Sequence, residues 1–214
     1  MKRRDFSLQL AGAGLSLAGF GPAHAQAPVE GTHYIKLSQP LPANLLPPPG
    51  KIDVAEFFWY ECPHCNAFEP VLEPWTKRLP PDVTFRRVPV GFSARHQVAQ
   101  KLYYALEEMG ALEATHRKIF TAVHGQGQRI TSEADAIGIA AAAGVDKAKL
   151  TDAIKSFGVN TKAAKARQLS EAYKVDGVPT LGIHGRYFTS AALAGGHDRA
   201  LAVADFLIQR SRKG

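Results

Sequence analysis

The chain contains two cysteines, and they lie three positions apart in the run Cys62-Pro63-His64-Cys65. This spacing suits a tight disulfide at the turn into a helix, and such a pair can be made and broken during function. Two cysteines are also half of a zinc site, but a structural zinc site needs four ligands and the chain has no third cysteine. The spacing therefore favours thiol–disulfide chemistry and predicts no metal.

The elements on either side of this run should place the cysteines at the end of a strand and the start of a helix. Ile52–Tyr60 is a nearly continuous apolar run, which predicts a central strand buried on both faces. Cys62 then lies at the N-cap of a helix, and Pro63 takes the first helical position, where a missing N–H has no consequence. We expect this helix to reach Leu79, with kinks near its two internal prolines.

This placement assigns different chemistry to the two thiols. At a helix start, a Cys62 thiolate faces unpaired N–H groups and the positive end of the helix dipole, both of which lower its pKa. His64 can add a donor or a positive charge, whereas the neighbouring carboxylate of Glu61 opposes the effect. Cys65 lies one turn further along and should be the more buried thiol, the one that attacks a mixed disulfide formed at Cys62. An inert structural disulfide is the alternative interpretation.

The rest of the chain supplies the surrounding strands and helices. Further strands are predicted at His33–Leu37, Val83–Val90, Thr180–Ile183 and Tyr187–Thr189. Helical spacing covers most of Ser93–Lys174, with a helix Glu133–Ala143 capped by Thr131, a helix containing Leu150, Ile154 and Phe157, and a long helix at Thr161–Lys174. A last amphipathic helix covers Asp198–Arg212.

The order of these elements predicts an α/β fold, in which a thioredoxin-like mixed sheet is flanked by helices and carries an inserted all-α helical domain. The expected division is a signal peptide, the first part of the thioredoxin-like domain, the helical insertion and the second part, at residues 1–25, 26–90, 91–165 and 166–214.

The N-terminus is typical of an export signal. Lys2-Arg3-Arg4 precedes a mildly apolar stretch, and Ala23-His24-Ala25 is a small-x-small cleavage site, so we expect cleavage near Ala25. The arginine pair also fits a twin-arginine signal, and a retained anchor is the alternative. Removing residues 1–25 leaves 23 basic and 18 acidic residues, so the net charge falls from +7 to +5. These charges form no basic stripe with aromatics, which argues against nucleic acid as a partner.

Three segments together resemble the DsbA family of exported thiol–disulfide oxidoreductases. They are Glu56-Phe57-Phe58, the block from Trp59 to Cys65 with Pro-His between the thiols, and Gly177-Val178-Pro179-Thr180 before a strand. The resemblance covers most of the mature chain. It implies a monomeric periplasmic oxidase without a cofactor, which donates its disulfide to reduced exported proteins and is reoxidised by a DsbB-like membrane quinone reductase.

The resemblance also implies roles for residues outside the cysteine motif. Pro179 would be a cis-proline facing the thiols, and the backbone of Val178 would pair with an extended substrate. Glu56 would be a buried carboxylate that passes protons to or from the inner cysteine, although a surface-facing Glu56 is the alternative. The family's lysine partner for this carboxylate is absent, and Arg86 and Arg87 are the nearest cations on the next strand.

Other functions fit parts of the pattern. An isomerase or reductase of the same fold would use the same thiols, but isomerases of this kind usually carry a dimerisation domain, for which residues 26–50 leave no room. A zinc carrier would need a further ligand, and a peptide-binding chaperone would not need thiols. A relative acting on small glutathione-linked molecules would not need the second cysteine. The remaining histidines show no metal-ligand spacing and are expected to be surface or capping groups: His33, His96, His116, His124, His184 and His197.

Overall fold

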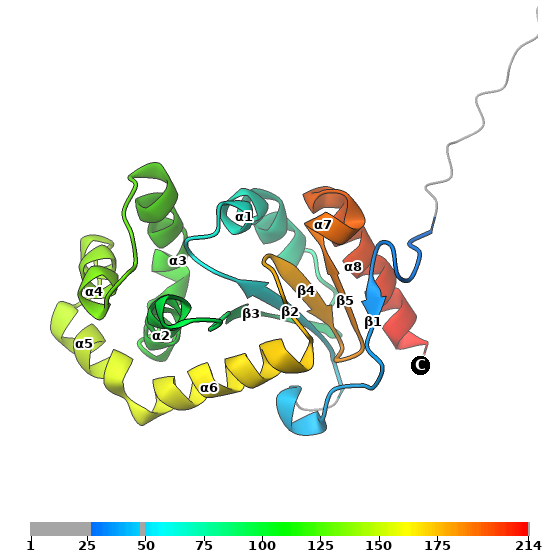
Figure 1. Cartoon of the computed structure of the whole chain (residues 1–214), viewed down its shortest axis with the longest axis horizontal. Helices are drawn as coiled ribbons and strands as arrows, with labels where there is room; N and C mark the ends of the chain where they lie inside the picture. Colours follow the sequence, from blue (N-terminus) through cyan, green and yellow to red (C-terminus); the bar gives the residue numbers. More distant parts are fainter. Residues whose placement is uncertain (1–26, 48–49, 214) are drawn as a thin grey trace, which may run out of the picture.

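The computed structural model describes residues 27–47 and 50–213. The predicted signal peptide and its cleavage site at Ala25 lie outside the described residues. The centre of the molecule is a five-stranded mixed sheet in the order β1-β5-β4-β2-β3 (Figure 1). Its strands are β1 (Ile35–Lys36), β2 (Ile52–Phe58), β3 (Val83–Pro89), β4 (Thr180–Ile183) and β5 (Tyr187–Ser190). β2 pairs in parallel with β3, and the other neighbouring strands are antiparallel.

β2 is the strand that leads into the cysteine motif. All seven of its residues are buried, as the apolar run predicted, because β3 and β4 flank it and helices cover both faces of the sheet. The strand ends at Phe58, two residues earlier than expected. The remaining residues before Cys62 form a turn, and the Cys62 N–H donates to the Trp59 carbonyl at 3.0 Å.

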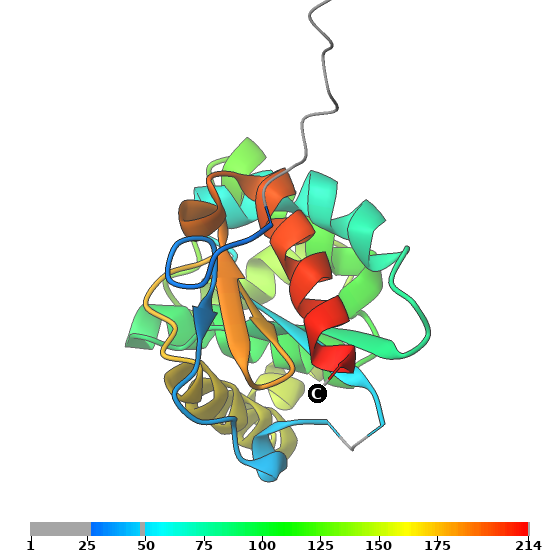
Figure 2. The ribbon, with the colours of Figure 1, turned by 90° about the vertical axis from the view of Figure 1, so that its right-hand side faces the viewer.

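The helices divide between the two faces of the sheet. They are α1 (Pro63–Thr76), α2 (Ala94–Glu108), α3 (Leu112–Phe120), α4 (Glu133–Ala142), α5 (Lys147–Lys155), α6 (Phe157–Ala172), α7 (Ala191–Ala194) and α8 (His197–Arg212), with short helical turns at Ala43–Leu45 and Thr121–Gly125. α1 and α8 share one hydrophobic core with the sheet, and Figure 2 shows α8 lying across that face. The opposite face packs in a second core against α6 and the group of helices from α2 to α5. This arrangement confirms the predicted fold class.

α1 ends at Thr76, three residues before the expected end at Leu79. At α4 and α6 the predicted starts are wrong, and in both cases a serine determines the true start. The cap of α4 is Ser132 rather than Thr131, because its side chain accepts from the Asp135 N–H and Asp135 accepts from the Ser132 N–H in return. Ser156 has an extended backbone and accepts from the Val159 N–H, so it separates α5 from α6. Phe157 therefore begins α6, with 87% of its surface exposed. α6 continues through residue 165, so the expected domain boundary lies inside a helix.

Within the part of the chain that the structure describes, no helix is both long and apolar enough to cross a bilayer.

Candidate active site

Cys62 and Cys65 lie at the start of α1, directly after the turn that follows β2. Cys62 is the N-cap of α1, with an extended backbone (φ −82°, ψ 117°), and Pro63 occupies the first turn as predicted. Both cysteines are free thiols. The Cys65 N–H donates to the Cys62 sulfur at 3.4 Å, so the sulfur takes the position that a capping oxygen usually takes. Cys65 is fully buried, whereas Cys62 retains 7% of its surface.

The pKa of Cys62 is lowered from 9.0 to about 6. The largest cause is a hydrogen bond from the Cys65 thiol, followed among the lowering effects by the backbone N–H groups of Cys65 and His64 and by the charge of His64. Burial acts in the opposite direction. At neutral pH the outer sulfur is therefore largely a thiolate. His64 is exposed and contributes less than the inner cysteine does.

Cys65 is shifted in the opposite direction. Burial raises its pKa well above 9.0, and the neighbouring Cys62 and the charge of Glu56 raise it further. The site therefore holds one nucleophilic sulfur that retains slight exposure to solvent and one fully buried, protonated sulfur, which is the asymmetry that dithiol exchange requires.

The Glu61 carboxylate, next to Cys62 in the sequence, is paired with two arginines. Arg95 donates two hydrogen bonds to its carboxylate, at 2.8 Å each, and Arg129 lies 3.0 Å away in a second ion pair. Arg95 also lies over the ring of Trp59, 5.5 Å from its centroid. The carboxylate is thus neutralised by two guanidinium groups, and it ties the turn before Cys62 to the start of α2.

The loop before β4 forms the opposite side of the site. The Val178–Pro179 peptide bond is cis, and the Val178 carbonyl lies 3.4 Å from the Cys62 sulfur, whose thiol form donates to it. Beside the cysteines, His64, Val178 and Pro179 line a groove of about 380 Å³, which continues along the start of α7 to His197. The structure thus brings the cysteine motif and the Val-Pro segment to one surface, although 116 residues separate Cys62 from Val178.

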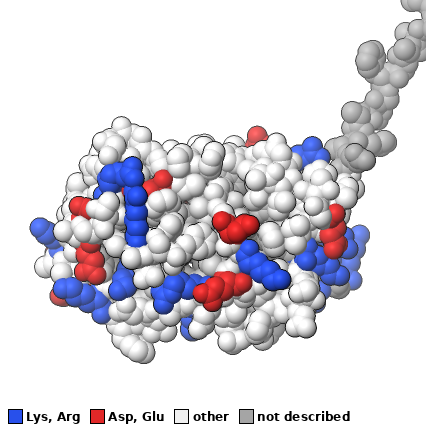
Figure 3. All heavy atoms as spheres, viewed as in Figure 1, with Lys and Arg blue, Asp and Glu red and all other residues white. Residues whose placement is uncertain are grey.

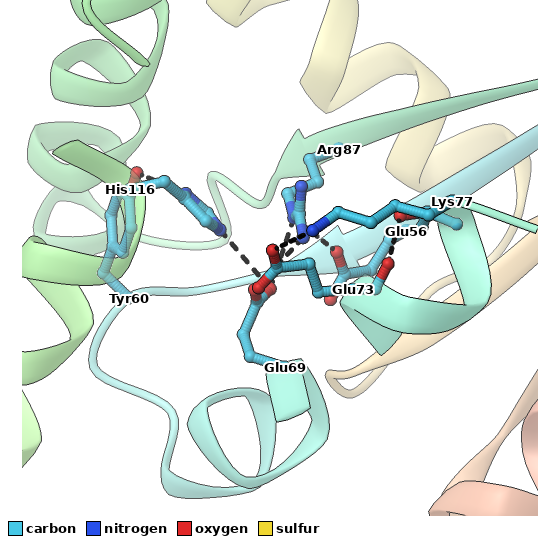
Figure 4. Close-up of polar contacts among 8 residues, drawn as sticks. Glu56, Tyr60, Glu69, Glu73, Lys77, Arg87 and His116 are labelled. Atoms are coloured by element: carbon cyan, nitrogen blue, oxygen red, sulfur yellow. Dashed lines mark hydrogen bonds and ion pairs between the residues drawn. The ribbon is translucent and has the colours of Figure 1, made fainter. Parts of the chain in front are cut away.

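Glu56 lies on the inner side of the site, in a buried cluster of charged groups (Figure 4). Its side chain is fully buried, so the alternative of a surface-facing Glu56 is wrong. The strand register places Arg87 opposite Glu56, and the Arg87 Nε lies 3.1 Å from a Glu56 oxygen. Arg86 points elsewhere and binds Asp53 through two hydrogen bonds, at 3.0 and 2.9 Å.

Glu69 and His116 also belong to this cluster, although neither was predicted from the sequence to be a site residue. Arg87 donates two hydrogen bonds to Glu69, and the His116 Nε2 lies 3.3 Å from the same carboxylate. The Tyr60 hydroxyl lies 2.8 Å from the His116 Nδ1. The expectation that His116 is a surface or capping group is therefore wrong, since only 6% of its surface is exposed.

A sequence signal existed for one of the two. Glu69 is seven residues after Cys62, two helical turns along the same side of α1, and its neighbour Phe68 belongs to the apolar face. A carboxylate at such a position suggests a buried polar partner. His116 comes from a helix in the insertion and carries no comparable signal.

The carboxylates of this cluster are shifted in opposite directions. Burial raises the pKa of Glu56 to about 8, and the negative charge of Glu69 adds to the increase, while Arg87 opposes it. Burial is also the largest single effect on Glu69, but the hydrogen bond from His116 and the charge of Arg87 outweigh it and lower the pKa of Glu69.

Within residues 27–47 and 50–213, no three His, Cys, Asp or Glu side chains are grouped in a way that could hold a metal ion.

Comparison with known proteins agrees with this geometry. Residues 85–207 match the family described as a DSBA-like thioredoxin domain. The thiol:disulfide interchange protein DsbA of Bordetella parapertussis is 41% identical over 216 residues, covering 100% of both chains. The DsbA of Pseudomonas aeruginosa is 38% identical over 190 residues, covering 89% of each chain.

Solved structures show the same likeness in three dimensions. A crystal structure of Pseudomonas aeruginosa DsbA superposes with a TM-score of 0.82 at 38% identity, covering 87% of this chain and 95% of that one. The oxidoreductase DsbA from Xylella fastidiosa gives a TM-score of 0.80 at 28% identity, with coverage of 87% and 99%. The family match, the near full-length relatives and the shared fold confirm the resemblance: this chain belongs to the DsbA family of thiol:disulfide oxidoreductases.

Proposed function

We propose that the protein oxidises pairs of thiols in reduced exported proteins, with Cys62 as the sulfur that exchanges with substrate. The observation that carries this proposal is the position of Cys62 at the first turn of α1, where hydrogen bonds from Cys65 lower its pKa to about 6. A stabilised thiolate makes the reduced form of the protein the favoured product, so the disulfide form gives up its bond readily. Each unit of pKa corresponds to ~1.4 kcal/mol, or ~30 mV for a two-electron couple.

The reaction proceeds in two exchanges. A substrate thiolate attacks the Cys62 sulfur of the disulfide form, the Cys62–Cys65 bond breaks, and a disulfide between substrate and Cys62 forms. Cys65 leaves as a thiolate and takes a proton from Glu56, whose raised pKa keeps it protonated at neutral pH. A second substrate thiolate then attacks the substrate sulfur of the mixed disulfide, and Cys62 leaves as a thiolate. Two electrons pass from the substrate to the protein.

The groove beside Cys62 is the proposed substrate site. An extended peptide would lie along Val178 and Pro179, and the Val178 backbone would pair with it in the manner of an added strand. On the face shown in Figure 3, acidic and basic side chains are intermixed, and the edge between α3 and α7 is mostly uncharged. Such a surface suits substrates of varied sequence, because it selects against neither sign of charge.

The proposal also includes the location of the protein, its reoxidation, its oligomeric state and its domain division. The signal-like N-terminus supports export to the periplasm, where reduced proteins arrive. A DsbB-like membrane quinone reductase would remove the two electrons and restore the disulfide. We propose a monomer without a cofactor, in which residues 91–165 form the helical insertion and α6 joins it to the second part of the thioredoxin-like domain.

The acidity of Cys62 tests the proposal directly. The rate of alkylation of the reduced protein by iodoacetamide, measured against pH, should rise with a midpoint near pH 6, because only the thiolate reacts. Cys65 is fully buried and should react slowly over the same range. A midpoint no lower than that of free cysteine, ~8.5, would contradict an oxidant.

The same assay ranks the groups that stabilise the thiolate. Cys65→Ala removes the largest lowering effect, the hydrogen bond from the inner thiol, and should raise the midpoint clearly towards that of free cysteine. His64→Ala removes only an exposed charge and should raise the midpoint by a smaller amount. A larger shift for His64→Ala than for Cys65→Ala would show that the charge, rather than the inner thiol, determines the acidity of Cys62.

A further inference from the structure

Two buried carboxylates share one guanidinium beneath the cysteine pair. Glu56 on β2 is 0% exposed and Glu69 on α1 is 1% exposed, and both contact Arg87 on β3 (Figure 4). Arginine keeps its proton in proteins, so the site contains a single permanent positive charge. Two ionised carboxylates beside it would leave an uncompensated negative charge in the interior. The pair is therefore expected to hold one proton at neutral pH.

The hydrogen bonds decide which carboxylate holds that proton. Glu69 accepts from the Arg87 Nε and Nη2, at 3.2 and 3.1 Å, and also contacts His116 at 3.3 Å. Glu56 has an ion-pair distance of 3.1 Å to Arg87, but the geometry gives neither of its oxygens a hydrogen bond. Donors stabilise the ionised form of the group that accepts from them. The negative charge thus belongs on Glu69 and the proton on Glu56.

The contacts of His116 fix its orientation and its tautomer. Burial raises the pKa of Tyr60 well above 10, so its hydroxyl stays protonated and donates to the His116 Nδ1. The Nε2 then carries the hydrogen and donates to Glu69. Burial lowers the pKa of His116, which favours this neutral form. The charged and titratable groups that contact His116 or act on its charge come from α1, β3, the turn after β2, α2 and its own helix. They are Glu69, Arg87, Tyr60, Tyr103 and Arg117.

We propose that Glu69 and His116 are positioning residues that keep the proton of this carboxylate pair on Glu56, next to the cysteines. Glu69 supplies the fixed negative charge that competes with Glu56 for Arg87, and His116 stabilises that charge with a hydrogen bond. The charge of Glu56 acts on both Cys62 and Cys65. This inference rests on the proposed function, in which Glu56 gives its proton to Cys65 when the internal disulfide breaks.

The outer side of the cluster opens to solvent. Glu69, Arg87 and His116 line a cavity of about 350 Å³ between α1 and α3, whose rim carries Glu73, Lys77, Glu113 and Arg117. After Glu56 has given up its proton, a proton from water in this cavity can restore the pair to its starting charge. The cavity and the substrate groove are lined by different residues, so a peptide bound in the groove does not fill this cavity.

The test measures protonation of the carboxyl groups rather than activity. Carbon-13 spectra of the reduced full chain, labelled at the glutamate carboxyls and assigned with Glu56→Gln and Glu69→Gln, report each group against pH. The Glu56 carboxyl should titrate near pH 8. In Glu69→Gln, Arg87 pairs with Glu56 alone, and the midpoint of Glu56 should fall by about one pH unit or more, a tenfold change in proton affinity.

Matched variants separate this role from a loss of packing. His116→Phe removes the donor to Glu69 and should lower the midpoint of Glu56 in the same direction, whereas His116→Gln, with an amide donor, should restore it. Glu73→Gln is the control, because Glu73 lies one turn further on α1, borders the same cavity and pairs with Lys77 at the surface. It should leave Glu56 unchanged.

The outcomes are decisive for each residue and distinguish this inference from the proposed function. An unchanged midpoint for Glu56 in folded Glu69→Gln overturns the role of Glu69, and an unchanged midpoint in folded His116→Phe overturns that of His116. If the carboxyl titrations behave as expected but the unmodified protein fails to oxidise a reduced substrate, the proposed function is wrong and the placement of the proton stands.

Discussion

Cys62→Ser is expected to reduce the oxidation of a reduced substrate protein to the uncatalysed rate. A serine hydroxyl at the start of α1 would receive the same hydrogen bonds, but it cannot form the disulfide through which electrons pass. The measurement is the rate at which an unfolded, reduced protein regains its disulfides in a glutathione buffer. Activity above background in folded Cys62→Ser would remove Cys62 from the mechanism.

Cys65→Ser is the matched variant, since it keeps Cys62 and removes only the buried sulfur. Its remaining thiolate can still exchange with oxidised glutathione or with the disulfide of a partner that then offers no second thiol, but the inner thiol is no longer present to displace that partner. Mixed disulfides should therefore accumulate, visible as a covalent adduct in mass spectrometry under non-reducing conditions. Release of the adduct as fast as in the unmodified protein would show that another thiol resolves it.

The fold was predictable because local and global patterns agree. The apolar run at Ile52–Tyr60 predicts a strand with both faces covered, and β2 lies inside the sheet with helices on both sides. The position of Pro63 after Cys62 predicts a helix start, and α1 begins there. At the start of α4 the prediction failed because two adjacent residues competed for one role. Thr131 and Ser132 are both good caps, and only the bond between Ser132 and Asp135 selects the second.

The family resemblance placed the Val-Pro segment opposite the thiols, and the rest of the active site was predictable only as far as neighbours in sequence determine it. The cysteine motif contains its own helix start, so the direction of the pKa shift of Cys62 follows from its position. The buried cluster depends on contacts across the fold: Glu69 from α1, Arg87 from β3 and His116 from α3 meet although 47 residues separate the first from the last. Nothing in the local pattern of His116 distinguishes it from a surface histidine.

Glu61 shows how such contacts change a conclusion drawn from proximity in sequence. Its carboxylate is adjacent to Cys62 along the chain and would oppose the thiolate if it were unpaired. Arg95 and Arg129 come from outside the motif and neutralise it, so the turn before α1 carries little net negative charge. The charge around a reactive sulfur therefore has to be read from the folded arrangement rather than from the sequence.

Glu56→Gln is expected to change how the stability of the reduced protein depends on pH. The pKa of Glu56 is raised from 4.5 to about 8, so between these values the folded protein holds a proton that the unfolded chain has released. Stability then falls as pH rises through this window, by about 1.4 kcal/mol per pH unit from this one group. At pH 7 the raised pKa of Glu56 lowers the unfolding free energy by about 3 kcal/mol, compared with a carboxyl group whose pKa does not change on folding. A glutamine is neutral throughout, and it removes this dependence.

The difference between the two proteins isolates the titration of Glu56 together with its coupling to Cys62, because the groups that do not interact with Glu56 titrate alike in both. Urea unfolding of the reduced forms at pH 5, 6, 7 and 8 should show Glu56→Gln gaining stability relative to the unmodified protein at each step. The control is Glu73→Gln, because the Glu73 carboxylate is exposed and pairs with Lys77 on the surface of α1. The difference in unfolding free energy between this variant and the unmodified protein should stay nearly constant from pH 5 to pH 8. A constant difference for Glu56→Gln as well would mean that Glu56 is already ionised at pH 5. It could not then supply a proton to Cys65, and the first exchange of the proposed reaction would need another acid.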